Sequence, residues 1–207
     1  MGEWWEDGLR VVGPTHYGVS AYAHGTGTAG GLTELGGPLL RAMDEVGMIL
    51  DLTHMAERAF WEALDAFRGP VLASHNNCRA LVPGDRQFSD DQVRAICERG
   101  GVIGVALDAW MLEPGWVIGE TMPEGLTLEA VADHIDHICQ LTGNVAHAAI
   151  GSDLDGGYGT EQTPSDLDTI ADLQRILEIL RERGYDRADL EAVAHDNWLG
   201  LFRRAWS

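Results

Sequence analysis

Short apolar runs alternate with longer amphipathic stretches along the whole chain, and this alternation constrains the fold more than any other feature. The apolar runs that read as strands are residues 9–16, 48–54, 69–75, 101–107 and 147–153. The stretches with helical spacing are 33–46, 56–67, 89–99, 127–141, 165–183 and 187–204. Apolar strands that alternate with helices indicate a parallel sheet whose faces are covered. We therefore expect an α/β fold.

Signals for helix ends support these boundaries. Ser89 followed by Gln92 has the pattern of a capping box, and Asp186 stands ahead of the last helical stretch. Glycine suits the left-handed residue that follows a helix, and it occurs after the expected helices at positions 47, 69, 100, 143 and 184. The expected elements are therefore separated by recognisable stops.

Two segments have neither strand nor helix periodicity. Residues 108–126 are punctuated by glycine and proline and predict a long loop after the fourth strand. Residues 25–30, GTGTAG, match the dinucleotide-binding pattern G-x-G-x-x-G but do not directly follow a strand. We interpret the second segment as a flexible loop over the edge of the sheet.

Four of the five expected strands end in a residue that can bind a metal ion or transfer a proton. These residues are His16, His54, His75 and Asp153. In a (β/α) barrel, residues at the carboxyl ends of several strands meet at one rim, whereas a doubly wound sheet concentrates its site at one switch point. The pattern favours the barrel. Because a complete barrel usually takes about 250 residues and only five βα units are visible, we expect residues 1–207 to form a single domain, an incomplete (β/α) TIM-type barrel.

The three histidines and the aspartate suggest a metal site. Imidazole is the commonest ligand of zinc-like ions, and catalytic sites combine histidine and carboxylate ligands from separate elements. The 21-residue interval from His54 to His75 fits a strand, a helix and the next strand, so both rings can face the same rim. One such histidine alone would be explained more simply as a hydrogen-bonded structural residue.

Composition excludes several classes of partner and chemistry. With 33 acidic and 14 basic residues the net charge is -19, which argues against nucleic acid and anionic membranes as partners. All the basic residues are arginines, so lysine chemistry is absent. Cys78, Cys97 and Cys139 are widely spaced and predict buried free thiols. No signal sequence or membrane-length apolar stretch is visible, so we expect a soluble, cytoplasmic protein.

Several motifs, in order, resemble the renal (membrane) dipeptidase family of binuclear zinc peptidases. They are PTH (14–16), GLTELG (31–36), AMDEVGMILDLTH (42–54), PVLASHNN (70–77), DRQFSDDQVRAI (85–96), GGVIGV (100–105), VADHIDHI (131–138), GSDLDG (151–156) and DNWLGLF (196–202). The resemblance covers residues 9–205 and implies strands four to eight of a (β/α) barrel. It also implies a dipeptide substrate.

Carried over position by position, the resemblance implies a role for each candidate residue. His54 and His75 would be ligands of one of two zinc ions. His16 would contact the scissile carbonyl or its oxyanion, and Asp153 would hold the substrate amine and transfer a proton. Arg86 would bind the carboxylate of the dipeptide. The implied reaction is attack on the amide by a hydroxide that bridges the two metal ions.

The sequence departs from the family pattern in the metal site. The family's H-x-D pair on the first strand and its bridging glutamate have no counterpart in residues 1–207. His134 and Asp136 spell H-x-D, but they lie in an expected helix within a family motif, so we do not interpret them as ligands. Gln87 replaces the usual asparagine, which leaves substrate preference open. We expect the C-terminal part of a dipeptidase, with an incomplete zinc site and no dipeptide hydrolysis unaided.

Two other interpretations stay open. The chain could be a non-catalytic module that completes its barrel with another chain, or a homo-oligomer, because five parallel strands leave apolar edges. It could also be a different barrel hydrolase, such as a deaminase or a lysine-carbamate amidohydrolase. The lack of lysine disfavours the carbamate type, and the order of the motifs disfavours the deaminases.

Overall fold

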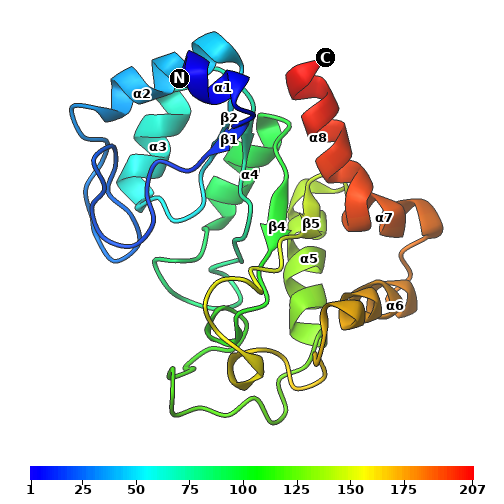
Figure 1. The fold of residues 1–207 in the computed structure, drawn as a ribbon. Helices are drawn as coiled ribbons and strands as arrows, with labels where there is room; N and C mark the ends of the chain where they lie inside the picture. Colours follow the sequence, from blue (N-terminus) through cyan, green and yellow to red (C-terminus); the bar gives the residue numbers. More distant parts are fainter.

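A computed structural model describes residues 1–207 and shows an α/β fold built on short parallel strands (Figure 1). The strands are β1 (Val11–Val12), β2 (Ile49–Asp51), β3 (Val71–Leu72), β4 (Ile103–Val105) and β5 (Ala148–Ile150). They pair in parallel in the orders β1-β2-β3 and β4-β5. A single bridge between Ala73 and Ile103 links the two sets. The five expected strands are confirmed in chain order.

The strands are shorter than the apolar runs predicted. The first run was expected over 9–16, but β1 holds only two residues and ends before Gly13 and Pro14. Proline has no N–H to donate to a neighbouring strand, so the ladder stops there. Beyond the strands the chain continues as irregular backbone, and the candidate site residues lie in these extensions.

Helices follow the strands as expected. They are α1 (Gly2–Glu6), α2 (Gly36–Val46), α3 (Glu57–Ala66), α4 (Asp90–Glu98), α5 (Glu129–Thr142), α6 (Gln174–Glu182), α7 (Arg187–Glu191) and α8 (Asn197–Trp206). Single turns of 3-10 helix occur at η1 (Ala109–Met111), η2 (Thr160–Gln162) and η3 (Ile170–Leu173), and η4 (Ala192–Asp196) is a π-helical turn. The short helix α1 was not predicted from the sequence.

The helix-end signals are confirmed with one exception. The capping boxes begun by Ser89 and Asp186 are both present, and glycines 47, 100, 143 and 184 all have the left-handed φ that suits them. Gly69 does not have that conformation, so its assignment as a helix stop was wrong. Its N–H donates instead to Asp44 Oδ1 at 2.7 Å, and a side chain there would collide with the Phe67 ring.

Two predicted helices need correction. The helix expected over 165–183 begins only at η3, because the preceding residues bind another loop. Ser165 donates to the carbonyl of Leu126, and the Asp166 carboxylate accepts the N–H of Leu128. These long-range hydrogen bonds hold residues 165 and 166 against the loop before α5 and keep them out of the helix.

The helix expected over 187–204 is divided into α7, η4 and α8. The wider π-helical turn lies just ahead of Asn197, whose amide donates to the carbonyls of Val145 and Ala148 at 2.7 and 2.8 Å. Trp198 also donates to the carbonyl of Ile150. The interruption therefore coincides with the segment where this helix attaches to β5.

Most residues of strands β2 to β5 are buried on both faces, which explains why these strands are apolar except for Asp51 at the end of β2. On one face, residues such as Leu50, Val71 and Ile103 belong to the main core with helices α2 to α5. The alternate residues form a smaller cluster with α8, made of Ile49, Leu72, Val102, Ala149 and Leu201. The period-2 alternation of a strand thus divides the core into two layers.

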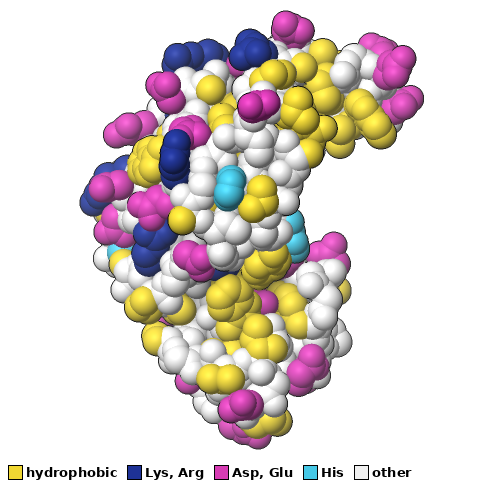
Figure 2. Space-filling model, turned by 90° about the vertical axis from the view of Figure 1, so that its left-hand side faces the viewer, with side chains coloured by type: hydrophobic (Ala, Val, Ile, Leu, Met, Phe, Trp, Pro, Cys, Tyr) yellow, Lys and Arg dark blue, Asp and Glu magenta, His cyan; other side chains and the backbone are white.

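The arrangement leaves the outer strands β1 and β5 with one neighbour each, and closure into a barrel is not seen. Both chain ends lie toward the same end of the molecule (Figure 1). After a quarter turn the outline is curved with one hollowed side, and a histidine side chain reaches the edge of that hollow (Figure 2).

The three cysteines are free and buried, as expected. None of the helices combines the length and the apolar character needed to cross a membrane.

Candidate active site

The candidate residues lie just beyond the ends of the parallel strands. His54 follows the end of β2 by three residues, His75 follows β3 by three, and Asp153 follows β5 by three. Because parallel strands end at the same side of a sheet, the common offset brings the side chains together. His54 and Asp153 have left-handed φ values of 66° and 61°. Non-glycine residues in this region cost about 1–3 kcal/mol each and cluster at functional sites.

His54 and His75 face each other through their Nε2 atoms, which are 3.1 Å apart. His54 is buried with 6% of its surface exposed, and His75 is half-buried. The Nδ1 atom of His54 lies 3.2 Å from the Thr26 hydroxyl, and the Nδ1 atom of His75 lies 2.8 Å from the Ser74 hydroxyl. Each ring is therefore held from behind by a hydroxyl and points its Nε2 at the other.

Electrostatics keep these two rings neutral. Burial lowers the pKa of His54 to about 2, and the positive charge of Arg86 acts in the same direction. Burial also lowers the pKa of His75, again with Arg86, although Asp153 and Asp51 oppose this shift. A neutral imidazole is the form that binds a metal ion.

His16 and Tyr17 lie over the same pair. The ring centroids of His16 and His54 are 4.0 Å apart, and the Tyr17 ring packs edge-on against His54 at 5.0 Å. Both His16 and Tyr17 are exposed, so they form the outer wall of the site. Partial desolvation raises the pKa of Tyr17, and the Arg86 guanidinium opposes this shift.

Asp153 approaches from the end of β5. Its Oδ1 atom lies 3.9 Å from His75 Nε2, and its side chain is partly exposed. The carboxylate therefore lies within ion-pair distance of one of the two facing ring nitrogens. The structure thus brings His54, His75 and Asp153 together, with His16 beside them.

Arg86 lies next to His75 and is buried, with only 2% of its surface exposed. Its guanidinium donates to Asn76 Oδ1 at 2.6 Å and to the carbonyl of His75 at 2.8 Å, while Nε has no partner. A substrate carboxylate can therefore reach Arg86 only if the side chains that cover it move. An unpaired buried donor costs about 1–3 kcal/mol, so a ligand that bonded to Nε would relieve this cost.

Two glycines allow the strand ends to approach this closely. A Cβ added to Gly151 would lie 2.1 Å from the Ser74 carbonyl oxygen, and one added to Gly104 would lie 2.3 Å from the same atom. Both contacts are with backbone, which cannot rotate away. The close approach of β3, β4 and β5 beside His75 and Asp153 thus requires glycine at both positions.

The distance between the Nε2 atoms of His54 and His75 suits two ligands of one zinc ion. Two nitrogens that bind one tetrahedral zinc at about 2.0–2.1 Å lie about 3.3 Å apart, close to the 3.1 Å seen here. No group of three or more His, Cys, Asp or Glu side chains in residues 1–207 is arranged to hold a metal ion. His134 lies in α5 as expected, and its Nδ1 accepts the N–H of Cys78 at 3.0 Å, so it is a structural residue.

Sequence reasoning missed the residues that support the site. Thr26 lies in the loop interpreted as flexible, but backbone pairing with Tyr17 fixes it beside His54. Asp51 and Ser74 form a short hydrogen-bonded chain behind His75. The lone acidic residue in the apolar run MILDLTH was a signal that could have identified Asp51. Nothing in the sequence connected Thr26 to a histidine 28 residues away.

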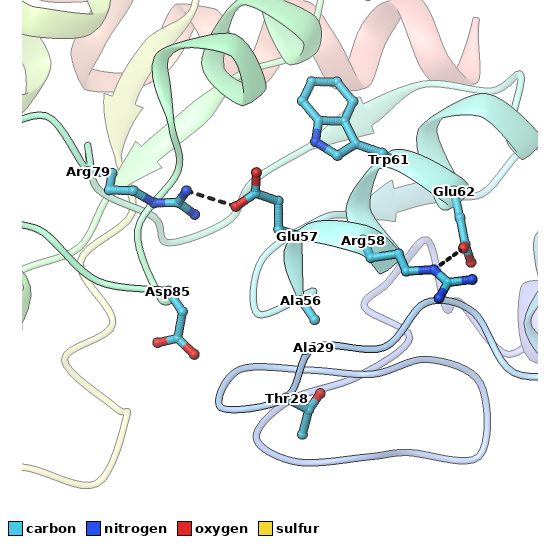
Figure 3. Close-up of a pocket in the computed structure, with 9 residues that line it drawn as sticks. All are labelled: Thr28, Ala29, Ala56, Glu57, Arg58, Trp61, Glu62, Arg79 and Asp85. Atoms are coloured by element: carbon cyan, nitrogen blue, oxygen red, sulfur yellow. Dashed lines mark hydrogen bonds and ion pairs between the residues drawn. The ribbon is translucent and has the colours of Figure 1, made fainter.

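A separate cavity of about 570 Å³ lies at the start of α3, on the outer side of the loop that carries Thr26. Figure 3 shows two ion pairs in its lining, Arg79 with Glu57 and, within α3, Arg58 with Glu62, and it shows the Asp85 carboxylate apart from both. None of the predicted site residues lines it. Its arginines and glutamates form ion pairs and the Asp85 carboxylate accepts the N–H of Gly27, so we assign it no chemistry.

Residues 2–206 match the sequence profile of the membrane dipeptidase family, peptidase family M19. This chain belongs to that family. The resemblance inferred from the motifs is thereby confirmed.

Solved M19 dipeptidases have a similar fold. Dipeptidase AC, a metallopeptidase, superimposes with a TM-score of 0.88 at 28% identity, over 99% of this chain and 60% of that one. A metallopeptidase from Rhodobacter sphaeroides, solved with a phosphinate mimic of the dipeptide L-Ala-D-Ala, gives 0.84 at 27% identity, over 99% and 58%. The chain therefore spans about three fifths of these dipeptidases.

Relatives found by sequence agree. An uncharacterized Klebsiella pneumoniae protein is 32% identical over 96% of this chain and 73% of its own length. Dipeptidase tcpJ of Claviceps purpurea is 30% identical over 84% of this chain and 38% of its own length. Proteins similar in sequence to this chain thus occur in both a bacterium and a fungus.

Proposed function

We propose that the chain is part of a zinc-dependent dipeptidase and holds one zinc ion through His54 and His75. The observation that carries this proposal is the 3.1 Å separation of their Nε2 atoms, which suits two ligands of a single cation. Membership of the M19 family supports the choice of reaction, and the neutral state of both rings supports the role of ligand.

The surrounding residues are suited to hydrolysis of a dipeptide. A zinc ion at this position supplies a Lewis acid and lowers the pKa of water. His16, exposed beside His54, donates a hydrogen bond to the oxygen of the scissile carbonyl. Asp153 holds the substrate amine and takes up a proton at its carboxylate oxygen. Arg86 binds the substrate carboxylate through Nε, the atom that has no partner.

We further propose that the five strands are part of a (β/α) barrel whose metal site needs ligands from outside residues 1–207. Two findings support this: no cluster of three metal-ligating side chains is present, and the chain matches about three fifths of the solved dipeptidases. A zinc site normally needs three protein ligands and an open position for catalysis. The pair of histidines can hold a zinc ion but is too few for a catalytic site.

Zinc binding tests the metal part of the proposal. We expect His54→Ala and His75→Ala each to abolish the zinc binding that the purified chain shows in competition with a chromophoric chelator. His195→Ala is the matched control, because His195 is exposed and pairs only with its neighbour Asp196. Equal loss of zinc in all three variants would mean that the histidine pair is not the site.

Dipeptide hydrolysis tests the second part. With zinc added, the purified chain should show no turnover of Gly-Leu above the His54→Ala background. Turnover that a chelator and His54→Ala both abolish would confirm a dipeptidase while showing that the metal site is complete within these residues. Turnover that neither treatment affects would contradict the zinc mechanism itself.

A second candidate function is that of a module which completes its barrel by association. The open edge of β1 carries an apolar groove of about 400 Å³, and exposed Trp4, Leu9 and Tyr22 line it. Exposed strand edges and apolar patches favour association. Sedimentation velocity tests whether the chain associates with itself. A stable monomer across a hundredfold range of concentration would contradict self-association.

A further inference from the structure

The hydroxyl of Ser74 is oriented by Asp51. Its oxygen lies 2.5 Å from Asp51 Oδ2, and a carboxylate can only accept, so the hydroxyl proton points to Asp51. Asp51 is itself fixed, because its Oδ1 accepts the N–H groups of Thr53 and Ser74 at 3.0 and 3.1 Å. With its one proton committed, Ser74 Oγ must accept from His75 Nδ1, 2.8 Å away. The neutral His75 ring therefore carries its proton on Nδ1.

Thr26 imposes the same constraint on His54. Its hydroxyl lies 3.3 Å from the carbonyl oxygen of His54 and 3.2 Å from the ring Nδ1 of the same residue. The hydroxyl donates to the carbonyl, and because its one proton is then used it accepts from Nδ1–H. Both contacts are made while His54 is held at a left-handed φ of 66°. Thr26 is buried, and its backbone N–H donates to the carbonyl of His16, so its position is fixed.

The two constraints together leave an unprotonated Nε2 on each ring, and these two nitrogens face each other. With both protons on Nδ1, the Nε2 atoms of His54 and His75 meet at 3.1 Å with no hydrogen between them. Two such acceptors repel unless a cation lies between them. The hydroxyls of Thr26 and Ser74 therefore hold both histidines in the tautomer that binds a cation through Nε2.

We propose that Thr26 and the Asp51–Ser74 pair are positioning residues that fix the tautomers of His54 and His75 and so aim both Nε2 atoms at one cation. This inference rests on the metal site proposed above and adds three residues to it. Partners of this kind behind metal-ligating histidines typically change metal affinity by about 10- to 100-fold when removed.

Asp51→Asn is the sharpest test, because it reverses the direction of the hydrogen bonds without changing shape. The two backbone N–H groups require the amide oxygen on their side, so the new NH₂ group faces Ser74 Oγ and donates to it. The Ser74 hydroxyl then donates to His75 Nδ1. We expect the His75 proton to move from Nδ1 to Nε2, as read by two-bond ¹H–¹⁵N correlation spectra of the ¹⁵N-histidine-labelled chain.

Companion variants separate positioning from mere structure. Ser74→Ala and Thr26→Val remove one hydroxyl each and should move the proton of His75 or His54, respectively, to Nε2. Ser74→Thr and Thr26→Ser keep the hydroxyl and should restore the wild-type spectrum. Thr53→Val is the control for loss of a hydroxyl in the same cluster: Thr53 Oγ1 lies 3.4 Å from Ser74 Oγ and from the backbone nitrogen of His75, but it contacts no ring nitrogen.

Zinc affinity, measured by chelator competition, gives a second readout. Asp51→Asn, Ser74→Ala and Thr26→Val should each weaken binding about 10- to 100-fold, and Thr53→Val should not. A wild-type spectrum with the His75 proton on Nε2, or an unchanged tautomer in Asp51→Asn and Ser74→Ala, overturns the proposal. If the tautomers respond as expected but the wild-type chain binds no zinc, the positioning inference stands and the proposed metal function fails.

Discussion

Gly151→Ala should damage the fold at the point where three strands converge on the candidate site. The added Cβ would lie 2.1 Å from the Ser74 carbonyl oxygen and 2.7 Å from Gly104 Cα, both backbone atoms. Real Cβ contacts stay beyond 3.0 Å, so the strands must separate by at least about 0.9 Å. Overpacking of this kind costs about 1–3 kcal/mol. For a domain of this size, that lowers Tm by about 2–12 °C.

Urea denaturation followed by tryptophan fluorescence measures this cost, because the chain has seven tryptophans. An unchanged m value would show that the loss lies in the folded state. The matched control is Gly200→Ala in α8, where the Cβ meets only the flexible end of Arg204 at 3.3 Å. In a helix that change should stabilise by about 0.5–1 kcal/mol. If Gly151→Ala lies within about 0.5 kcal/mol of wild type, the close approach of the strands is refuted.

Three further predictions follow from single features. Ser89→Ala removes the cap of α4 and should lower the free energy of unfolding by about 1 kcal/mol in urea, whereas Ser89→Thr should not. Asp153→Gly relieves a left-handed φ of 61° and should raise stability by about 1 kcal/mol; a loss would show that the carboxylate stabilises the fold. Burial raises the pKa of Cys97 to about 12 and of Cys139 to about 11 from an ordinary 9.0. Unfolded thiols lose their protons first, so stability should fall between pH 9 and pH 11 by up to about 1.4 kcal/mol per pH unit for each thiol, and Cys97→Ala should reduce that slope.

The sequence predicted helix ends correctly where the residues that set them lie within the same turn of the chain. The capping residues Ser89 and Asp186 and the glycine after α2, Gly47, act within one turn of a helix, so the sequence around them is sufficient. Predictions failed where a distant partner competed. Ser165 binds a loop 39 residues away instead of starting a helix, and Gly69 binds Asp44 instead of ending one.

The candidate site shows the same division. The strand-end positions of His54, His75 and Asp153 could be predicted, because strand period and parallel pairing place such residues on one side of a sheet. Their ring directions could not. Those depend on the hydroxyls of Thr26 and Ser74, and only Ser74 is a neighbour in sequence.

The sequence alone determined the order of strands and helices, the M19 relationship and which side chains stand at the strand ends, because each of these is written in short motifs and regular spacing. The tertiary structure decided the 3.1 Å meeting of two ring nitrogens, the burial of Arg86 and the glycine contacts that let three strands converge. These depend on distances between segments far apart in the chain. Only packing of the whole chain sets such distances.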